Sequence, residues 1–210
     1  MRGLYAIVDC DFLAARSCEP LAFLERLLEA RPAAIQLRAK SVGARATLDL
    51  ASRMAALCRD AGTPFFVNDR PDLALLSGSP GVHLGQSDLR LEDVRRLSPE
   101  LRLGISTHRY DELEQALAEQ PSYVAFGPVF ATRSKRDPEP VVGLEALARA
   151  GARCRQAQVT LVAIGGIDEA RAPEVAARAD VGAVISALLP PGGLAHVTAT
   201  ARRLHTLLGG

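Results

Sequence analysis

The sequence predicts a single α/β domain over residues 1–210, folded as a (β/α)8 barrel of the TIM-barrel type. Two observations predict this fold. Short apolar segments rich in β-branched and aromatic residues alternate along the chain with segments of helical periodicity. Eight such pairs in about 200 residues suit a closed barrel of parallel strands joined by right-handed crossovers. An open doubly wound sheet is the alternative, but no GxGxxG motif follows the first predicted strand.

The predicted strands are short and end in polar or glycine residues, as strands of a barrel with a functional rim do. In chain order they are LYAIVD from Leu4, AAIQLR from Ala33, PFFVND from Pro64, GVHLG from Gly81, RLGIS from Arg102, SYVAFG from Ser122, TLVAIGG from Thr160 and VGAVIS from Val181. The predicted helices cover residues 21–30, 45–61, 72–77, 91–97, 111–119, 144–157, 170–179 and 194–208. The longest connection lies between Phe130 and Val142, and such a long polar loop is typical of a lid.

Composition narrows the class of function. The net charge is +1 and the isoelectric point is about 7.7, which argues against a nucleic-acid or membrane-surface binder. The start of the chain has no signal-peptide pattern, and nowhere do about 18 uncharged apolar residues run together, so we expect a cytoplasmic protein. The four cysteines show no CxxC spacing, which favours structural thiols over a zinc site.

In the segment QLRAK, the polar residues Gln36, Arg38 and Lys40 alternate with Leu37 and Ala39. A continuing strand would direct all three polar side chains to one face, which is costly inside a barrel unless an anion binds there. Arg38 could hold a phosphate through two hydrogen bonds, and Lys40 could add a point charge. The alternative for Arg38 is a salt bridge to a carboxylate at the barrel rim.

Asn68 and Asp69 interrupt the next apolar run, and Asp88 follows the strand after that. Because neighbouring strands lie about 4.8 Å apart, Asp69 and Asp88 can converge on one cation at the barrel mouth. Two carboxylates, with phosphate oxygens and water, form a typical Mg2+ site. The alternative is that each aspartate caps the helix that follows it.

Further polar groups follow the fifth, seventh and eighth strands. Ser106 could bond a phosphate or cap the next helix, whereas His83 within a strand is expected to be a packed, hydrogen-bonded histidine. His108 can be either packed or functional, and His196 and His205 are expected on a helix surface. Gly165 and Gly166, with Ile185 and Ser186 after the last strand, could offer backbone N–H groups to a phosphate or form plain turns.

Seven blocks carry a resemblance to a known family. They are QLRAK, NDRPDLALL, GVHLGQSDL, GISTH, GPVFATRSK, VAIGGI and VGAVISAL, in this order. On these blocks the chain resembles the thiamine-phosphate synthases, from Leu4 to about Leu189. The resemblance implies coupling of (4-amino-2-methyl-5-pyrimidinyl)methyl diphosphate with a thiazole phosphate, giving thiamine phosphate and diphosphate.

The resemblance also implies a role for each matching residue. Arg38, Lys40, Ser106 and Lys135 would be catalytic, and Asp69 and Asp88 would hold Mg2+ as the cofactor. Gln36, Arg38, Lys40, Asn68 and Ser106 would bind the pyrimidine diphosphate. Thr132, Ser134, Gly166, Ile185 and Ser186 would bind the thiazole phosphate, with Lys135 on the diphosphate. The implied partners are these small molecules and, as one option, a second copy of the chain; no nucleic acid or membrane is expected.

The sequence departs from the family pattern at Ala39, where Glu is usual, at Ala131, where Pro is usual, and after IGGI, where Asn is frequent. Two other functions stay open. A thiazole tautomerase uses the same barrel without a metal, but such relatives tend to carry His where Pro128 stands and to lack the paired aspartates and the loop lysine. A barrel that only binds thiamine precursors is the second alternative.

Overall fold

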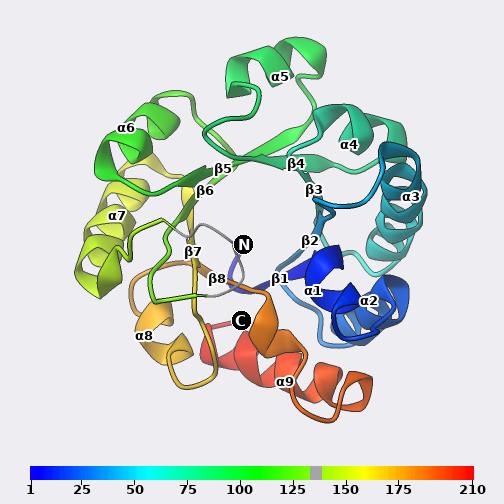
Figure 1. The fold of residues 1–210 in the computed structure, drawn as a ribbon. Helices are drawn as coiled ribbons and strands as arrows, with labels where there is room; N and C mark the ends of the chain where they lie inside the picture. Colours follow the sequence, from blue (N-terminus) through cyan, green and yellow to red (C-terminus); the bar gives the residue numbers. More distant parts are fainter. Residues whose placement is uncertain (133–138) are drawn as a thin grey trace.

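Eight parallel strands pair in sequence order, and β8 pairs with β1 to close the barrel in this computed structural model (Figure 1). The structure describes residues 1–132 and 139–210. The strands are β1 (Gly3–Asp9), β2 (Ala34–Arg38), β3 (Phe65–Asn68), β4 (Gly81–Leu84), β5 (Arg102–Thr107), β6 (Tyr123–Phe126), β7 (Thr160–Ile164) and β8 (Val181–Val184). The predicted barrel is therefore confirmed, with each strand within two residues of its predicted bounds.

Helices form an outer ring around the strands (Figure 1). They are α1 (Cys10–Ala14), α2 (Pro20–Leu28), α3 (Ala44–Asp60), α4 (Pro71–Ser77), α5 (Leu91–Leu97), α6 (Tyr110–Ala118), α7 (Gly143–Ala157), α8 (Ala172–Ala176), the 3-10 helix η1 (Ser186–Leu188) and α9 (Leu194–Leu207). No helix within residues 1–132 and 139–210 has both the length and the apolar character needed to cross a membrane.

Three helical elements differ from the prediction: α8 is shorter, and α1 and η1 were not predicted. Helix α8 is shorter than the predicted 170–179, because Pro173 lies at its start and a proline is excluded from a helix interior. Helix α1 was not predicted, since it follows β1 without a loop. The Asp9 carboxylate accepts a hydrogen bond from the backbone N–H of Phe12 (2.9 Å) and caps this helix.

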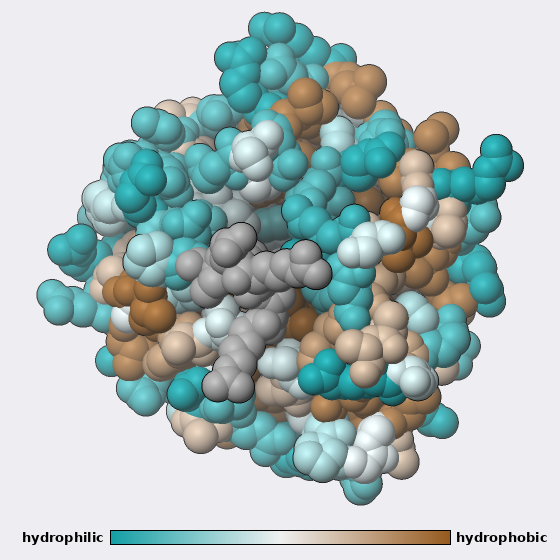
Figure 2. Space-filling view, viewed as in Figure 1, coloured by the Kyte–Doolittle hydropathy of each residue, from teal (hydrophilic) through white to brown (hydrophobic). Residues whose placement is uncertain are grey.

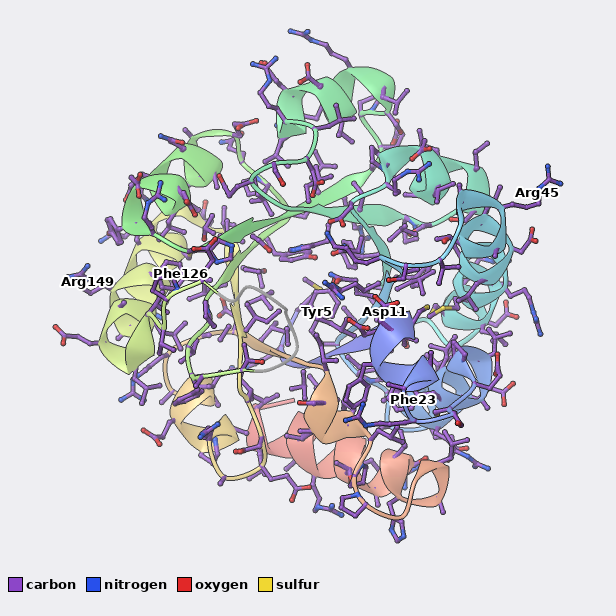
Figure 3. All side chains as sticks on the ribbon, viewed as in Figure 1. Tyr5, Asp11, Phe23, Arg45, Phe126 and Arg149 are labelled. Atoms are coloured by element: carbon purple, nitrogen blue, oxygen red, sulfur yellow. The ribbon has the colours of Figure 1, made fainter. Side chains whose placement is uncertain are left out.

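Alternation along each strand divides the apolar residues into two layers. In β1, Leu4, Ala6 and Val8 pack outward against the helices. Tyr5 and Ile7 point into the barrel, as Figure 3 shows for Tyr5. Inside, the rings of Tyr5, Phe66 and Tyr123 lie with centroids 5.2–5.8 Å apart and fill the lower part of the barrel. The cavity above them is where ligands can enter.

The cysteines and one histidine belong to this scaffold. Cys10, Cys58 and Cys154 are buried, and burial raises the pKa of their thiols to about 11, 12 and 11, as expected for structural thiols. His196 is exposed as predicted. The prediction for His205 was wrong: it is half-buried under the barrel, where its Nδ1 accepts from the N–H of Leu4 (3.2 Å).

Gly104 on β5 leaves room for the Tyr123 ring. A Cβ at this position would overlap the ring atoms of Tyr123 on the neighbouring strand. We therefore expect Gly104→Ala to lower the free energy of unfolding by about 1–3 kcal/mol, the usual cost of overfilling a packed interior. Denaturant unfolding measures the change. Gly43→Ala is the control, because a Cβ there has no neighbour within 4 Å and φ is −64°. Equal stability of the two variants would contradict this account of the interior.

Candidate active site

The carboxyl ends of the strands surround a cavity of about 540 Å³. Seven predicted site residues reach it from β2, β3, β4 and β5: Gln36, Arg38, Lys40, Asn68, Asp69, Asp88 and Ser106. A second pocket adjoins it at the ends of β6, β7 and β8 and is lined by Thr132, Gly166 and Ser186, while Ile185 lines both. Ser134 and Lys135 lie outside the described residues. Hydrophilic side chains surround much of this face of the molecule (Figure 2).

The polar residues of β2 lie on one face, as the alternation predicted. Gln36 is buried and donates from Nε2 to the Tyr5 hydroxyl (3.1 Å). Arg38 pairs with the buried Asp9 on the neighbouring strand β1, with 2.5 Å between Nη1 and Oδ2. The rim salt bridge considered for Arg38 is therefore present. Because a guanidinium carries five N–H donors, the pairing leaves others for an anion.

The two aspartates that could hold a metal lie close together. Asp69 follows β3 with φ of +65°, a left-handed conformation that aspartate, after glycine and together with asparagine, adopts more readily than other residues. Its backbone N–H donates to the carbonyl of His83 (2.7 Å), which fixes the turn. The Asp69 carboxylate pairs with the Lys40 ammonium at 2.7 Å, and the Asp88 carboxylate accepts from the N–H of Gly85 at 2.7 Å.

The alternative that these aspartates cap helices is wrong. The residues at the N-caps of α4 and α5 are Arg70 and Arg90, and neither helix has a side-chain cap. Asp69 and Asp88 instead direct their carboxylates toward the cavity and toward each other. Burial raises the pKa of Asp88, and the nearby negative charge of Asp69 raises it further. Within the described ranges no group of three or more His, Cys, Asp or Glu side chains could hold a metal.

Ser106 reaches the cavity from β5 and does not cap α6, whose N-cap is Arg109. Its hydroxyl lies 2.8 Å from Nε2 of His83. His83 is buried on β4, and its Nδ1 lies 2.8 Å from the hydroxyl of Tyr123. His83 is thus the packed, hydrogen-bonded histidine that the sequence predicted, although it also lines the cavity.

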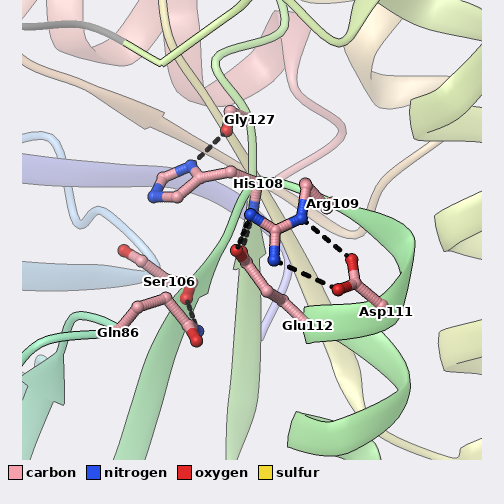
Figure 4. A network of polar contacts seen from close by, with 7 residues as sticks. All are labelled: Gln86, Ser106, His108, Arg109, Asp111, Glu112 and Gly127. Atoms are coloured by element: carbon pink, nitrogen blue, oxygen red, sulfur yellow. Dashed lines mark hydrogen bonds and ion pairs between the residues drawn. The ribbon is translucent and has the colours of Figure 1, made fainter.

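A polar network supports the wall between the two pockets (Figure 4). His108 donates from Nδ1 to the carbonyl of Gly127 (2.6 Å), since a carbonyl can only accept. The backbone N–H of His108 donates to Glu112 (2.7 Å), which also pairs with Arg109 (3.1 Å). Gln86 donates to the carbonyl of Ser106 (2.6 Å). His108 lines both pockets and is also hydrogen-bonded to the neighbouring backbone.

The second pocket depends on backbone packing. Gly165 and Gly166 follow β7 with φ of +102° and +66°. A Cβ on Gly165 would meet Pro128 at 2.5 Å, and one on Gly166 would meet the carbonyl of Ala131 at 2.6 Å. These glycines therefore let the chain after β6 lie directly on the turn after β7.

Sequence reasoning missed several residues of the site: Tyr5, Asp9, Gln86, Glu112 and Tyr123. Asp9 had a visible signal, because it ends the first predicted strand at the same rim as Arg38. The tyrosines had none, since a tyrosine in an apolar strand is usual core.

The fold and site can be compared with known proteins. The family model described as thiamine monophosphate synthase matches residues 4–188. The thiamine-phosphate synthase of Methanocella arvoryzae is 40% identical over 207 residues, 98% of this chain and 94% of that protein. That of Chloroflexus aurantiacus is 36% identical over 206 residues, 98% of this chain and 92% of that protein.

Among solved structures, thiamine phosphate pyrophosphorylase from Pyrococcus furiosus superposes with a TM-score of 0.85 at 30% identity, covering 98% of this chain and 95% of that one. A 3-hexulose-6-phosphate synthase superposes with a TM-score of 0.66 at 17% identity, covering 99% of this chain and 100% of that one. The second likeness shows the barrel fold alone.

The charge of Asp69 gives a testable effect on its neighbour. Asp69→Asn removes the negative charge beside Asp88, so the pKa of Asp88 should fall toward its ordinary value. Titration of the side-chain carboxyl carbons by NMR, without divalent cations, measures it. Asp60→Asn, at the exposed end of α3, is the control and should leave the Asp88 titration unchanged.

The same shift has a consequence for stability. A carboxyl whose pKa is higher in the folded than in the unfolded state favours folding while it is protonated. That contribution is present below the unfolded pKa of about 3.9 and is lost as the pH rises through the folded pKa. Asp88→Asn should therefore not lower Tm at pH 7 in metal-free buffer. A lower Tm of Asp88→Asn, together with an Asp88 titration that is the same in Asp69→Asn as in the parent, would contradict the proposed repulsion.

Proposed function

Because the chain belongs to the thiamine monophosphate synthase family, we propose that it is a transferase that condenses (4-amino-2-methyl-5-pyrimidinyl)methyl diphosphate with a thiazole phosphate. The products are thiamine phosphate and diphosphate. The observation that carries the proposal is two adjoining pockets at one barrel mouth. One is rich in charged side chains, and the other is lined by apolar side chains, glycine backbone and a few polar side chains. Two phosphorylated substrates need such a pair of sites.

We assign the larger cavity to the pyrimidine diphosphate. Gln36 and Asn68 would contact the ring, and Arg38, Lys40 and Ser106 would contact the diphosphate. The smaller pocket would receive the thiazole phosphate through Thr132, Ser134, Gly166, Ile185 and Ser186. Lys135 would reach the diphosphate from the loop after β6.

A magnesium ion fits the aspartate pair. Asp69 and Asp88 offer two carboxylates that face each other across the cavity wall, and a bound cation would relieve the repulsion that raises the pKa of Asp88. Both residues would hold Mg2+, with the remaining ligands supplied by diphosphate oxygens and water. When bound, the ion neutralises charge on the departing diphosphate.

The chain's own residues then bind the two substrates and orient them for the reaction. Arg38, Lys40 and Lys135 would stabilise the charge that grows on diphosphate as the carbon–oxygen bond breaks. The electron-rich aminopyrimidine stabilises the methylene cation, and the second pocket holds the thiazole nitrogen toward that carbon. The reaction requires no nucleophilic side chain and no general base.

We further propose that the protein acts in the cytoplasm on these small molecules. A homodimer is the oligomeric state to test, because the large apolar side chains Leu76, Leu89 and Leu97 are exposed on or beside α4 and α5. Apolar side chains gather over this region in Figure 2. Sedimentation would decide between dimer and monomer.

The metal assignment predicts a loss of activity without a loss of fold. Asp69→Asn and Asp88→Asn should each lower the rate of thiamine phosphate formation by about 10²-fold or more, because a preorganised stabiliser of leaving-group charge is lost. A coupled assay with both substrates, with and without Mg2+, measures it. Arg45→Ala, on the outer surface of α3 (Figure 3), is the matched control. Full activity of both aspartate variants in chelated buffer would exclude the metal role, and binding without diphosphate release by the parent would favour the precursor-binding alternative.

Lys135 should act on the transition state more than on the bound substrate. Lys135→Ala is therefore expected to lower kcat by about 10²-fold with a smaller rise in KM, whereas Arg38→Ala should show more of its effect in KM. Single-turnover measurements separate chemistry from binding. If Lys135→Ala turns over at the parental rate and only binds more weakly, the loop lysine is a docking group.

A further inference from the structure

A chain of hydrogen bonds crosses the floor of the larger cavity from β2 to β5. Gln36 Nε2 donates to the Tyr5 hydroxyl (3.1 Å), which lies 2.8 Å from the hydroxyl of Tyr123. Tyr123 lies 2.8 Å from Nδ1 of His83, whose Nε2 lies 2.8 Å from the hydroxyl of Ser106. The first four residues are at most 7% exposed. The two ends are proposed substrate contacts, and the three residues between them have no assigned role.

The protons of this chain can be counted. Burial raises the pKa of Tyr5 and of Tyr123, so both phenols keep their protons at neutral pH. With His83 neutral, as the proposal requires, its imidazole has one N–H, and the serine hydroxyl has one O–H. The three links from Tyr5 to Ser106 use three of these four protons. One proton is therefore left at one end of the chain.

Only two uniform orders satisfy every link. In the first, Gln36 donates to Tyr5, each phenol donates toward His83, and the Nε2–H of His83 donates to Ser106. The Gln36 carbonyl then faces the cavity as an acceptor, and the Ser106 O–H is free to donate. In the second order every hydrogen bond runs the other way. The Gln36 amide then turns its N–H₂ to the cavity, and the Ser106 O–H donates to His83. The two orders thus present opposite groups at both ends.

We propose that this chain of hydrogen bonds positions the substrate. Through Tyr123 and His83, the orientation of the Gln36 amide is coupled to whether the Ser106 hydroxyl donates toward the cavity. The inference rests on the proposed function and names its specificity determinant. The first order offers an acceptor to the 4-amino group of the pyrimidine and a donor to its diphosphate. The substrate therefore fits the first order at both Gln36 and Ser106.

A pyrimidine with a 4-oxo group in place of the amino group cannot be matched in this way. Its oxygen needs the Gln36 N–H₂, which belongs to the second order, and that order turns the Ser106 proton away from the diphosphate. Any fit leaves one buried polar contact unmade, which is the strongest form of discrimination that hydrogen bonding provides. Rejection of the oxo compound thus depends on Tyr123 and His83, which link Gln36 and Tyr5 to Ser106.

Packing holds the chain in place. The Tyr5 and Phe66 rings meet Tyr123 edge to face, with interplanar angles of 78° and 88°. The His83 ring stacks on Tyr123 at 12°, with 5.6 Å between centroids. Side chains locked in this way cannot rotate to new partners, so a change at one end must pass along the links.

The first test reads the proton directly. In protein labelled with 15N in its histidine rings and saturated with the pyrimidine diphosphate alone, His83 should be the Nε2–H tautomer. His108, whose Nδ1 donates to the Gly127 carbonyl, provides an internal comparison because its Nδ1 must carry a proton. The His83→Gln variant assigns the signal. An Nδ1–H or doubly protonated His83 in this complex would overturn the proposal.

The second test reads specificity. The ratio of the inhibition constant of the 4-oxo diphosphate to the KM of the 4-amino substrate should fall about tenfold in Tyr123→Phe. Thr107→Val is the matched control: it removes another buried hydroxyl, bonded to the carbonyl of Ala125 at 3.1 Å, from the strand that carries Ser106. This control should keep the parental ratio. An unchanged ratio in Tyr123→Phe would overturn the inference.

A double-mutant cycle separates positioning from packing. If Tyr123 acts through Ser106, Tyr123→Phe should lower kcat/KM in the parent and have little further effect in Ser106→Ala. Equal factors in both backgrounds would show that Tyr123 only supports the core, and would refute the inference. The proposed function is tested separately by the parent's formation of thiamine phosphate, so an active parent with additive variants would leave the function standing.

Discussion

Hydrogen bonding between β1 and β8 closes the sheet, with Gly3 opposite Val181 and Ala6 opposite Val184. Closure removes both sheet edges and brings the carboxyl ends of all eight strands to one rim. Residues as distant in sequence as Gln36 and Ile185 line the same cavity for this reason. In an open sheet the two would lie near opposite edges, and no pair of adjoining pockets could form. The proposed activity therefore depends on barrel closure before it depends on any side chain.

Depth in the barrel decides which polar groups are charged. Deepest lie the neutral hydroxyls of Tyr5 and Tyr123, hydrogen-bonded to each other. Arg38, whose side chain is 17% exposed, is paired with Asp9, and the Lys40 side chain at the rim is 52% exposed. This gradient follows from desolvation, since an ion costs more to bury than a hydrogen-bonded neutral group.

The sequence was enough to predict the strands, most helices and the rim position of the polar residues, because those depend on periodicity and on where apolar runs end. It did not decide between capping and metal binding for Asp69 and Asp88, since both interpretations use the same position after a strand. Barrel closure turns both carboxylates to one cavity, and neither of them caps α4 or α5. The Tyr5–Tyr123 contact was beyond sequence reasoning, because it joins strands that neither adjoin in the chain nor pair in the sheet.

On the proposed function, the ion pairs at the rim must exchange partners when substrate enters. Lys40 now neutralises Asp69, while Asp88 bears the repulsion of that same carboxylate. A cation shared by the two aspartates would replace the ammonium and free Lys40 for the diphosphate, so the metal and the lysine need not compete for one charge. Arg38 differs, because its partner Asp9 is buried and also caps α1. Arg38 therefore stays fixed and offers its remaining N–H groups, whereas Lys40, more exposed, is the cation free to move.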